Sequence, residues 1–249
     1  MDSRLPVFRN MDGFEPFLAE RARAAKMEVG SVALDHLRLA GWRFDLGPFG
    51  AVFKRIDSSF FDVVGVSVTT SGPEVSGWEQ PMLEERGPGF VALFTHDVVT
   101  TYYALVRMIA EPGNMGYNIG SVDAPMNSHV LVAPSFQASH GNLTSNPGKV
   151  PLASFVVQMT PEVAPGSFSL KLKTVTAPKE GGRYLHSFNH QGLLVVKSQE
   201  REALESAVLA LPEDQGRDDY AWVSRSLLRE IRDRGWANAH LWSAMALLV

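Results

Sequence analysis

The stretch GFVALFTHDVVTTYYALVRMIAEPGN, residues 89–114, decides how the chain can fold. Two apolar runs rich in Val, Tyr and Phe flank the short polar segment Thr95-His96-Asp97, and the second run ends at a Pro-Gly pair. This pattern is typical of a β-hairpin, because strands favour β-branched and aromatic residues and a tight turn joins them. The stretch therefore predicts two long antiparallel strands with their turn at residues 95–97.

The segments on either side predict further strands in the middle of the chain and helices near both ends. Alternating or continuous apolar runs indicate strands in FFDVVGVSVTT (60–70), SHVLVAPSFQAS (128–139), LASFVVQMT (152–160), SFSLKLKTVTA (167–177) and GLLVVKS (192–198). Helical spacing of apolar residues occurs in FEPFLAERARAAKME (14–28), DDYAWVSRSLLREIRDRG (218–235) and NAHLWSAMALLV (238–249). Asn238 is the expected N-cap of the last helix. SVALDHLRLAGW (31–42) predicts a short strand that leads into a short helix.

This order of elements predicts an α+β fold with a mixed, largely antiparallel sheet, because strands and helices do not alternate along the chain. We expect residues 1–28 to form an N-terminal segment and helix. We expect residues 29–249 to form a single domain.

Composition narrows the class of partner. The chain has 249 residues, a net charge of −4 and no cysteine. A weakly acidic chain without a long Lys/Arg block is not expected to bind nucleic acid or a membrane surface. The absence of cysteine excludes disulfides and cysteine-ligated zinc, and it is compatible with the cytoplasm. Neither a signal peptide nor a long apolar span is predicted, so we expect a cytoplasmic protein with a small-molecule partner.

Motifs of the common cofactor and nucleophile sites are absent from the sequence. It contains no dinucleotide fingerprint, P-loop or nucleophile elbow. His186 and His190 have the spacing of a helical zinc pair, but they fall in an expected turn, so we predict two solvated histidines and no metal site. REIRDRG (229–235) resembles the metal-binding helix of Nudix hydrolases, but Arg234 stands where a carboxylate is required. We interpret it as the charged face of a helix. His240 shows no pattern beyond packing or solvation.

Four loop segments have a composition that suits ligand binding. Each joins a Gly or Pro to amide, carboxylate or imidazole groups, which can satisfy many polar atoms of one small ligand. These segments are GWEQP (77–81), AEPGN (110–114), APSFQASHGN (133–142) and GGRYLH (181–186).

At these positions the sequence resembles the NDP-hexose 2,3-dehydratase family of deoxysugar biosynthesis. The family's modules follow the order W-x-Q-P, E-P-G-N, Q-A-T-x-S-N-Y, G-G-R-F and Y-x-W. This chain has WEQP (78–81), EPGN (111–114), QASHGN (137–142), GGRY (181–184) and YAW (220–222), in the same order and at similar spacing. The resemblance covers the chain from about Val29 to the C-terminus. It implies a Nudix-like α/β/α sandwich without the Nudix catalytic box.

The resemblance also implies a reaction, the loss of water across C2 and C3 of a nucleotide-bound 4-keto-6-deoxyhexose. The C4 ketone acidifies the C3 proton, a base removes that proton, and the C2 hydroxyl leaves from the enolate with the help of an acid. Such an elimination needs no metal and no redox cofactor, so none is expected.

The candidate site residues follow from this chemistry. Glu111, His140 and His186 are the candidates for proton transfer. Arg183 is the candidate for a diphosphate, and Trp78 either stacks on a base or fills the core. The full set of substrate-binding candidates is Trp78, Gln80, Arg107, Asn114, Gln137, Ser139, Asn142, Arg183 and Tyr184.

The chain also departs from the family pattern, and the departures leave alternatives open. The family usually carries two modules in tandem, whereas one is found here. Either a homodimer supplies the second module, which is the expected arrangement, or the second module is dispensable. The family's Q-A-K-x-E corresponds to Arg107-Met108-Ile109-Ala110-Glu111, which replaces a lysine by Ile109. The scaffold can therefore act on a nucleotide sugar or on another keto compound. It can dehydrate, isomerise or cyclise a polyketide-like substrate, or bind a ligand or partner without catalysis.

Overall fold

The structure is a computed structural model of the whole chain. It describes residues 4–25, 27, 29–47, 50–57, 61–71, 76–85, 87–98, 101–112, 116–118, 129–139, 142–143, 150–157, 172–179 and 183–248. Among these residues the strands form two sheets of different size, and helices lie near both ends of the chain. The predicted α+β class is therefore confirmed.

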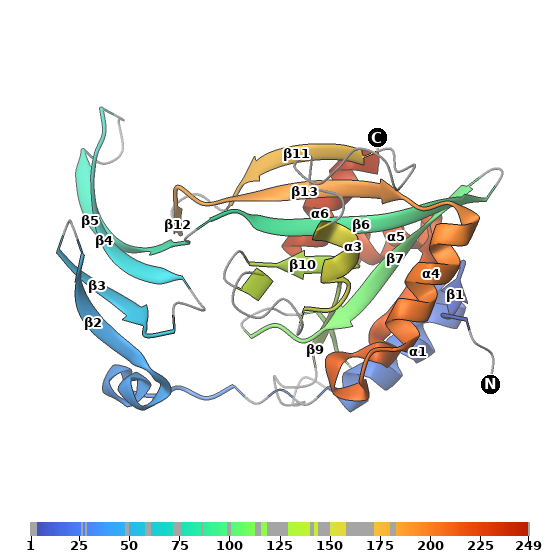
Figure 1. The fold of residues 1–249 in the computed structure, drawn as a ribbon, viewed down its shortest axis with the longest axis horizontal. Helices are drawn as coiled ribbons and strands as arrows, with labels where there is room; N and C mark the ends of the chain where they lie inside the picture. The colour runs from blue at the N-terminus through green and yellow to red at the C-terminus, as the bar shows by residue number, and fades with distance from the viewer. Residues whose placement is uncertain are drawn as a thin grey trace.

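The larger sheet forms the centre of the molecule (Figure 1). Its main path is β1 (Val7–Phe8), β14 (Tyr220–Ser224), β7 (Thr101–Ile109), β6 (Gly89–Val98), β13 (Phe188–Val195) and β11 (Leu172–Pro178). β10 (Phe136–Ala138) pairs with β6, β9 (His129–Pro134) pairs with β7, and β8 (Tyr117–Asn118) pairs with β9. The β1–β14 and β13–β6 pairs are parallel, and the other pairs of this sheet are antiparallel. The sheet is thus mixed and largely antiparallel, as predicted.

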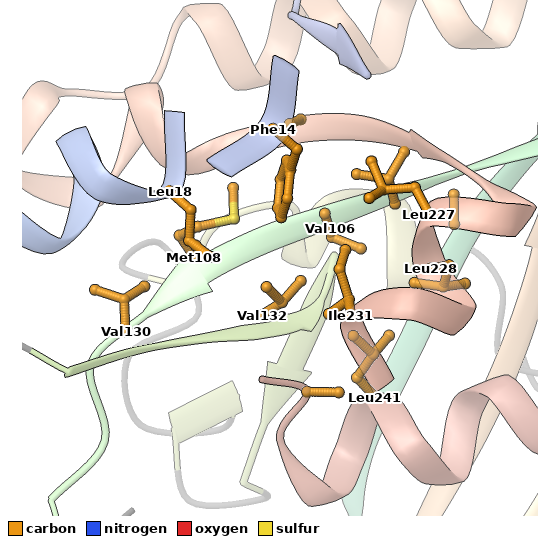
Figure 2. Close-up of a cluster of buried hydrophobic side chains, with 14 of the residues drawn as sticks. Phe14, Leu18, Val106, Met108, Val130, Val132, Leu227, Leu228, Ile231 and Leu241 are labelled. Carbon is orange, nitrogen blue, oxygen red and sulfur yellow. The ribbon is translucent and has the colours of Figure 1, made fainter. Parts of the chain in front are cut away.

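Helices cover both faces of this sheet because successive side chains on its strands point to opposite sides. On β7, Ala104, Val106 and Met108 join a core with α1 (Met11–Ala24), α5 (Arg225–Asp233) and α6 (Ala239–Met245). Figure 2 shows this cluster, in which Phe14 and Leu18 of α1 lie over the sheet. Tyr103 and Leu105 belong to a second core with α3 (Ala153–Val157) and α4 (Ser198–Leu209). The predicted α/β/α layering is present, and its relation to the Nudix fold stays a prediction.

The smaller sheet extends to the left of the larger one in Figure 1. Its order is β12 (Tyr184–Leu185), β5 (Gly77–Glu84), β4 (Asp62–Thr69), β3 (Gly50–Arg55) and β2 (Trp42–Gly47), and the 3-10 helix η1 (Leu34–Ala40) precedes β2. Stacking of Trp42 on Phe53, with 5.2 Å between ring centroids, stabilises the β2–β3 hairpin. Phe44 and Leu46 remain largely exposed on it.

The central hairpin opens into a fork, and the fork creates the space for a site. β6 and β7 pair only near their turn, from Thr95 opposite Ala104 to Val98 opposite Thr101. Further along, β10 pairs with β6 and β9 pairs with β7. Ser135 lies where they diverge and is buried; its hydroxyl accepts from the Phe94 N–H at 3.1 Å and donates to the Leu105 carbonyl. One side chain therefore satisfies both backbone groups that the fork separates.

Several local predictions were wrong. Residues 95–97 do not form the turn, because the antiparallel ladder continues through them to Val98. Residues 153–157 of the predicted strand 152–160 form α3, since a short apolar run does not distinguish a buried strand from a helix. Residues 220–224 were predicted to start a helix but form the fully buried strand β14. Residues 77–81, expected as a loop, lie in β5, and the strand expected at the start of residues 31–42 is not formed before η1. The β2–β3 hairpin and α4 were not predicted.

Candidate functional site

A cavity of about 960 Å³ lies beside the fork. This volume is of the size that encloses a cofactor or substrate in other proteins. Its walls come from α1, the end of β7, the β9–β10 corner and the segment that leads into β14. The lining residues are Arg21, Ala24, Ala25, Arg107, Met108, Ile109, Ala110, Glu111, Val130, Ala133, Pro134, Ser135, Phe136, Gln137, Val150, Pro151, Glu213, Asp214, Gly216, Asp218, Asp219 and Tyr220.

A carboxylate held by two side-chain amides forms part of the cavity wall. Glu111 follows β7, and its Oε1 accepts hydrogen bonds from Gln137 Nε2 at 3.0 Å and from Asn238 Nδ2 at 3.1 Å. Asn238 Nδ2 also donates to Gln137 Oε1 at 2.9 Å. This closed set of hydrogen bonds fixes the orientation of the carboxylate, as a proton-transfer group requires.

The backbone of the segment before α6 places Asn238 in this cluster. The Val132 N–H donates to the Trp236 carbonyl at 2.8 Å, and the Asn238 N–H donates to the Val132 carbonyl at 3.0 Å. Asn238 Oδ1 accepts from the Leu241 N–H at 2.9 Å, which confirms the predicted N-cap. One side chain thus begins a helix with its oxygen and holds Glu111 with its nitrogen.

His240, at the start of α6, lies in the electrostatic field of the same cluster. Burial lowers the pKa of His240, while the charge of Glu111 acts in the opposite direction. Lys179 lowers this pKa further, and it forms an ion pair of 2.5 Å with Glu85 where the two sheets meet. The imidazole is therefore biased towards its neutral form close to the carboxylate.

The cavity wall also contains two arginines near the carboxyl group of Asp219. Arg107 on β7 donates from Nη2 to the Gln215 carbonyl at 3.2 Å, and its guanidinium lies 5.5 Å from the Tyr220 ring centroid. Arg21 on α1 approaches Asp219 at 4.0 Å. Burial raises the pKa of Asp219 above its ordinary value, while Arg107 and Arg21 pull it down.

The structure brings three of the predicted site residues together on the cavity wall, namely Arg107, Glu111 and Gln137. Ser139 and Asn142 lie just beyond β10, where Ser139 Oγ accepts from the Asn142 N–H at 3.2 Å, and neither lines the cavity. Asn114 and His140 fall outside the described residues.

The remaining predicted residues lie elsewhere. Trp78, Gln80 and Tyr184 belong to the smaller sheet, and Arg183 immediately precedes β12. Trp78 Nε1 donates to Gln80 Oε1 at 2.8 Å. His186 is exposed in the turn after β12, with a φ of 52°. None of these residues lines the cavity.

The expectation of two solvated turn histidines is only half right. His190 lies within β13 rather than in the turn. Its ring packs near Phe90 and Phe188, with centroid distances of 5.3 Å and 5.5 Å. Within the described part of the chain, no group of three or more His, Cys, Asp or Glu residues is arranged to hold a metal ion. No described helix is long and apolar enough to cross a membrane.

Arg21, Asn238, His240 and Tyr220 were not among the predicted site residues. Asn238 carried a signal as a helix cap, and Tyr220 belongs to the YAW motif (220–222), but neither signal located them at a cavity. Arg21 is in the N-terminal helix, outside the range of the motif series. Their roles depend on contacts between segments far apart in the sequence.

The fold and the cavity together define an α+β protein with a cavity whose wall carries an oriented carboxylate. Comparison with known proteins is more specific: a family model described as NDP-hexose 2,3-dehydratase matches residues 11–248. The chain belongs to this family of dehydratases, as the sequence motifs predicted.

Two curated relatives match part of the chain. The dTDP-4-dehydro-6-deoxy-alpha-D-glucopyranose 2,3-dehydratase of Streptomyces violaceoruber is 30% identical over 152 residues, which is 61% of this chain and 30% of that protein. The enzyme of the same name from Saccharopolyspora spinosa is 27% identical over 142 residues, 56% of this chain and 25% of that protein. The aligned segments thus span less than a third of either relative.

Proposed function

We propose that this chain is a lyase that eliminates water across C2 and C3 of a nucleotide-bound 4-keto-6-deoxyhexose. The observation that carries the proposal is the hydrogen-bonded cluster of Glu111, Gln137 and Asn238 on the wall of a substrate-sized cavity. Family membership and the names of both relatives support the same reaction.

Glu111 is the proposed base of the first step. Its carboxylate takes the proton from C3, and the electrons of the C3–H bond form the enolate with the C4 oxygen. The enolate then expels the C2 hydroxyl, which leaves as water with the proton that Glu111 had taken up. Gln137 and Asn238 hold the carboxylate in one orientation throughout, so that little reorganisation accompanies proton transfer. His240, biased to its neutral form, is the nearby group that can exchange a proton with this cluster.

Replacement of the base tests the proposal. We expect Glu111→Gln to lower turnover of the 4-keto-6-deoxyhexose nucleotide by about a hundredfold or more, because the amide cannot accept the proton. The matched control is Glu202→Gln, since Glu202 is exposed on α4 and does not line the cavity. Circular dichroism reports whether each variant remains folded. Full turnover by a folded Glu111→Gln variant would remove Glu111 from the mechanism.

A second candidate is the same enolate chemistry on a keto compound without a nucleotide. It is favoured by Ile109, which lines the cavity at the position of the family's lysine, and by the apolar lining residues Met108 and Phe136. Exposed Glu213 and Asp214 add negative charge at the cavity. Thermal unfolding with thymidine diphosphate separates the two candidates, because a ligand of the native state raises the melting temperature. An unchanged melting temperature at millimolar nucleotide favours the second candidate.

A further inference from the structure

Three buried hydrogen-bond donors on the cavity wall lack a partner among the described residues. They are Arg21 Nε, Arg107 Nε and the Tyr220 hydroxyl. Buried polar groups are nearly always hydrogen-bonded, and an exception calls for an explanation such as a missing ligand. All three groups are able to donate, so the missing partner is rich in acceptors.

The surrounding contacts hold these donors in place without saturating them. The Arg107 guanidinium lies over the Tyr220 ring, and β7 pairs directly with β14 at Arg107 and Tyr220. The Arg21 guanidinium lies 5.7 Å from the Phe17 ring centroid. Aromatic faces orient a guanidinium while leaving its in-plane N–H groups for another partner. A small rotation of each side chain therefore turns a donor towards a ligand.

Gly216 allows the cavity wall to approach these groups closely. Its φ of 79° is in the left-handed region, which glycine adopts without strain. A Cβ at this position would lie 2.8 Å from Arg107 Nη2 and 2.5 Å from Asp219 Oδ2. The arrangement of Arg107 and Asp219 thus depends on the absence of a side chain at residue 216.

We propose that Arg21, Arg107 and Tyr220 form the subsite for the diphosphate of the nucleotide-sugar substrate. The inference rests on the proposed function, because that function supplies a diphosphate-bearing ligand. Guanidinium groups match phosphate oxygens through paired N–H donors, and a phenol adds a third donor. The subsite replaces Arg183 as the diphosphate ligand, since Arg183 lies beside β12 of the smaller sheet and away from the cavity lining.

The acidic residues of this region set how strongly the subsite binds. Asp219 is the carboxylate next to both arginines, while Asp218 pairs with Arg217 at 3.2 Å. A phosphate and the Asp219 carboxylate compete for the same guanidinium groups. We therefore expect Asp219→Asn to strengthen diphosphate binding several-fold, because it removes the competing charge and keeps the side-chain size.

The decisive variants remove the donors one at a time. Tyr220→Phe removes only a hydroxyl whose neighbour in the described protein is the Arg107 guanidinium of the same subsite, so the fold should keep most of its stability. Arg107→Gln removes one guanidinium. The matched controls are Tyr117→Phe and Arg225→Gln, since Tyr117 packs against Trp236 and Arg225 against Tyr102, both outside the cavity lining.

Binding is measured by calorimetry and thermal shift with inorganic pyrophosphate, thymidine diphosphate and thymidine. We expect pyrophosphate and thymidine diphosphate to bind the unmodified protein. We expect Tyr220→Phe and Arg107→Gln each to weaken both by about tenfold or more, while the controls do not. Thymidine binding should be the same in all variants, because the nucleoside does not touch the subsite.

Each outcome bears on the subsite and on the proposed function separately. Thymidine diphosphate binding that survives both variants would overturn the subsite and leave the nucleotide substrate standing. Pyrophosphate binding that depends on Tyr220 and Arg107, without binding of thymidine diphosphate, supports the anion subsite and argues against a nucleotide substrate. Failure of pyrophosphate and thymidine diphosphate to bind the unmodified protein would overturn the subsite. The proposed function is then tested separately, by turnover of the 4-keto-6-deoxyhexose nucleotide.

Discussion

Ser135 shows how a single hydroxyl stabilises the fork in the central hairpin. Its hydroxyl accepts from the Phe94 N–H and donates to the Leu105 carbonyl in a buried position. We expect Ser135→Ala to lower the free energy of unfolding by about 1–3 kcal/mol, because two backbone groups lose their partner. Urea denaturation measures this change. Ser206→Ala, at an exposed position of α4, is the control, and an equal loss in both variants would contradict the role of Ser135.

Asp219 links stability to pH. Burial raises its pKa in the folded protein above the ordinary value, so the folded state binds this proton more tightly than the unfolded chain. The ionised group therefore costs stability at neutral pH, and the cost disappears as the pH falls through the raised pKa towards the ordinary value. We expect Asp219→Asn to melt at a higher temperature than the unmodified protein at pH 7. The difference in melting temperature should shrink on acidification. A difference that grows would show that the two arginines affect the pKa of Asp219 more strongly than burial does.

At the scale of the element, α6 depends on the same residue that orients the proposed base. Asn238→Ala removes the cap acceptor for the Leu241 N–H and the amide that donates to Glu111. We expect a loss of about 1 kcal/mol of unfolding free energy from the cap. A separate fall in turnover should follow from the released carboxylate.

Asn10 supplies the control for this prediction, because it caps α1 through the Gly13 N–H and does not line the cavity. Asn10→Ala should lose comparable stability and keep its turnover at a temperature where both variants remain folded. Equal turnover in the two variants would show that Asn238 acts only as a cap.

The strands differ in how well the sequence pattern predicted them. Strands with an alternating pattern or a long apolar run were predicted well, as in β4, β7 and β9, whereas only the second half of β13 was predicted. β14 was missed because all five of its residues are buried, Ala221 and Val223 in one core and Tyr220 and Trp222 in the other. Burial on both faces erases the alternation by which a strand is recognised.

At the scale of the whole molecule, the association state is open to a direct test. The homodimer expected from the family's tandem modules stays a prediction. The smaller sheet exposes Phe44, Leu46 and Trp78, with 63%, 87% and 43% of their surface accessible, so apolar surface is present that a second copy can cover. Light scattering should give twice the chain mass of 27.3 kDa across a concentration series. A mass of one chain at every concentration would contradict the dimer.

The candidate site was predictable only in part. Glu111 and Gln137 stand in motifs, EPGN (111–114) and QASHGN (137–142), whose composition already pointed to a ligand. Trp78 and Arg183 stand in equally suggestive motifs, yet the structure places them with the smaller sheet. Motif composition reports which groups are available, but not which of them the chain brings to one cavity.

The sequence by itself determined the hairpin of residues 89–114, the α+β class and the family, because these follow from local periodicity and from the order of short motifs. The tertiary structure alone decided that Asn238 joins Glu111 across 127 positions and that Arg21 of the first helix meets Asp219. Periodicity records that a residue is buried, whereas the identity of its partner depends on how distant segments pack. A candidate site assembled from α1, β7, β10, β14 and α6 therefore appears only once the chain has folded.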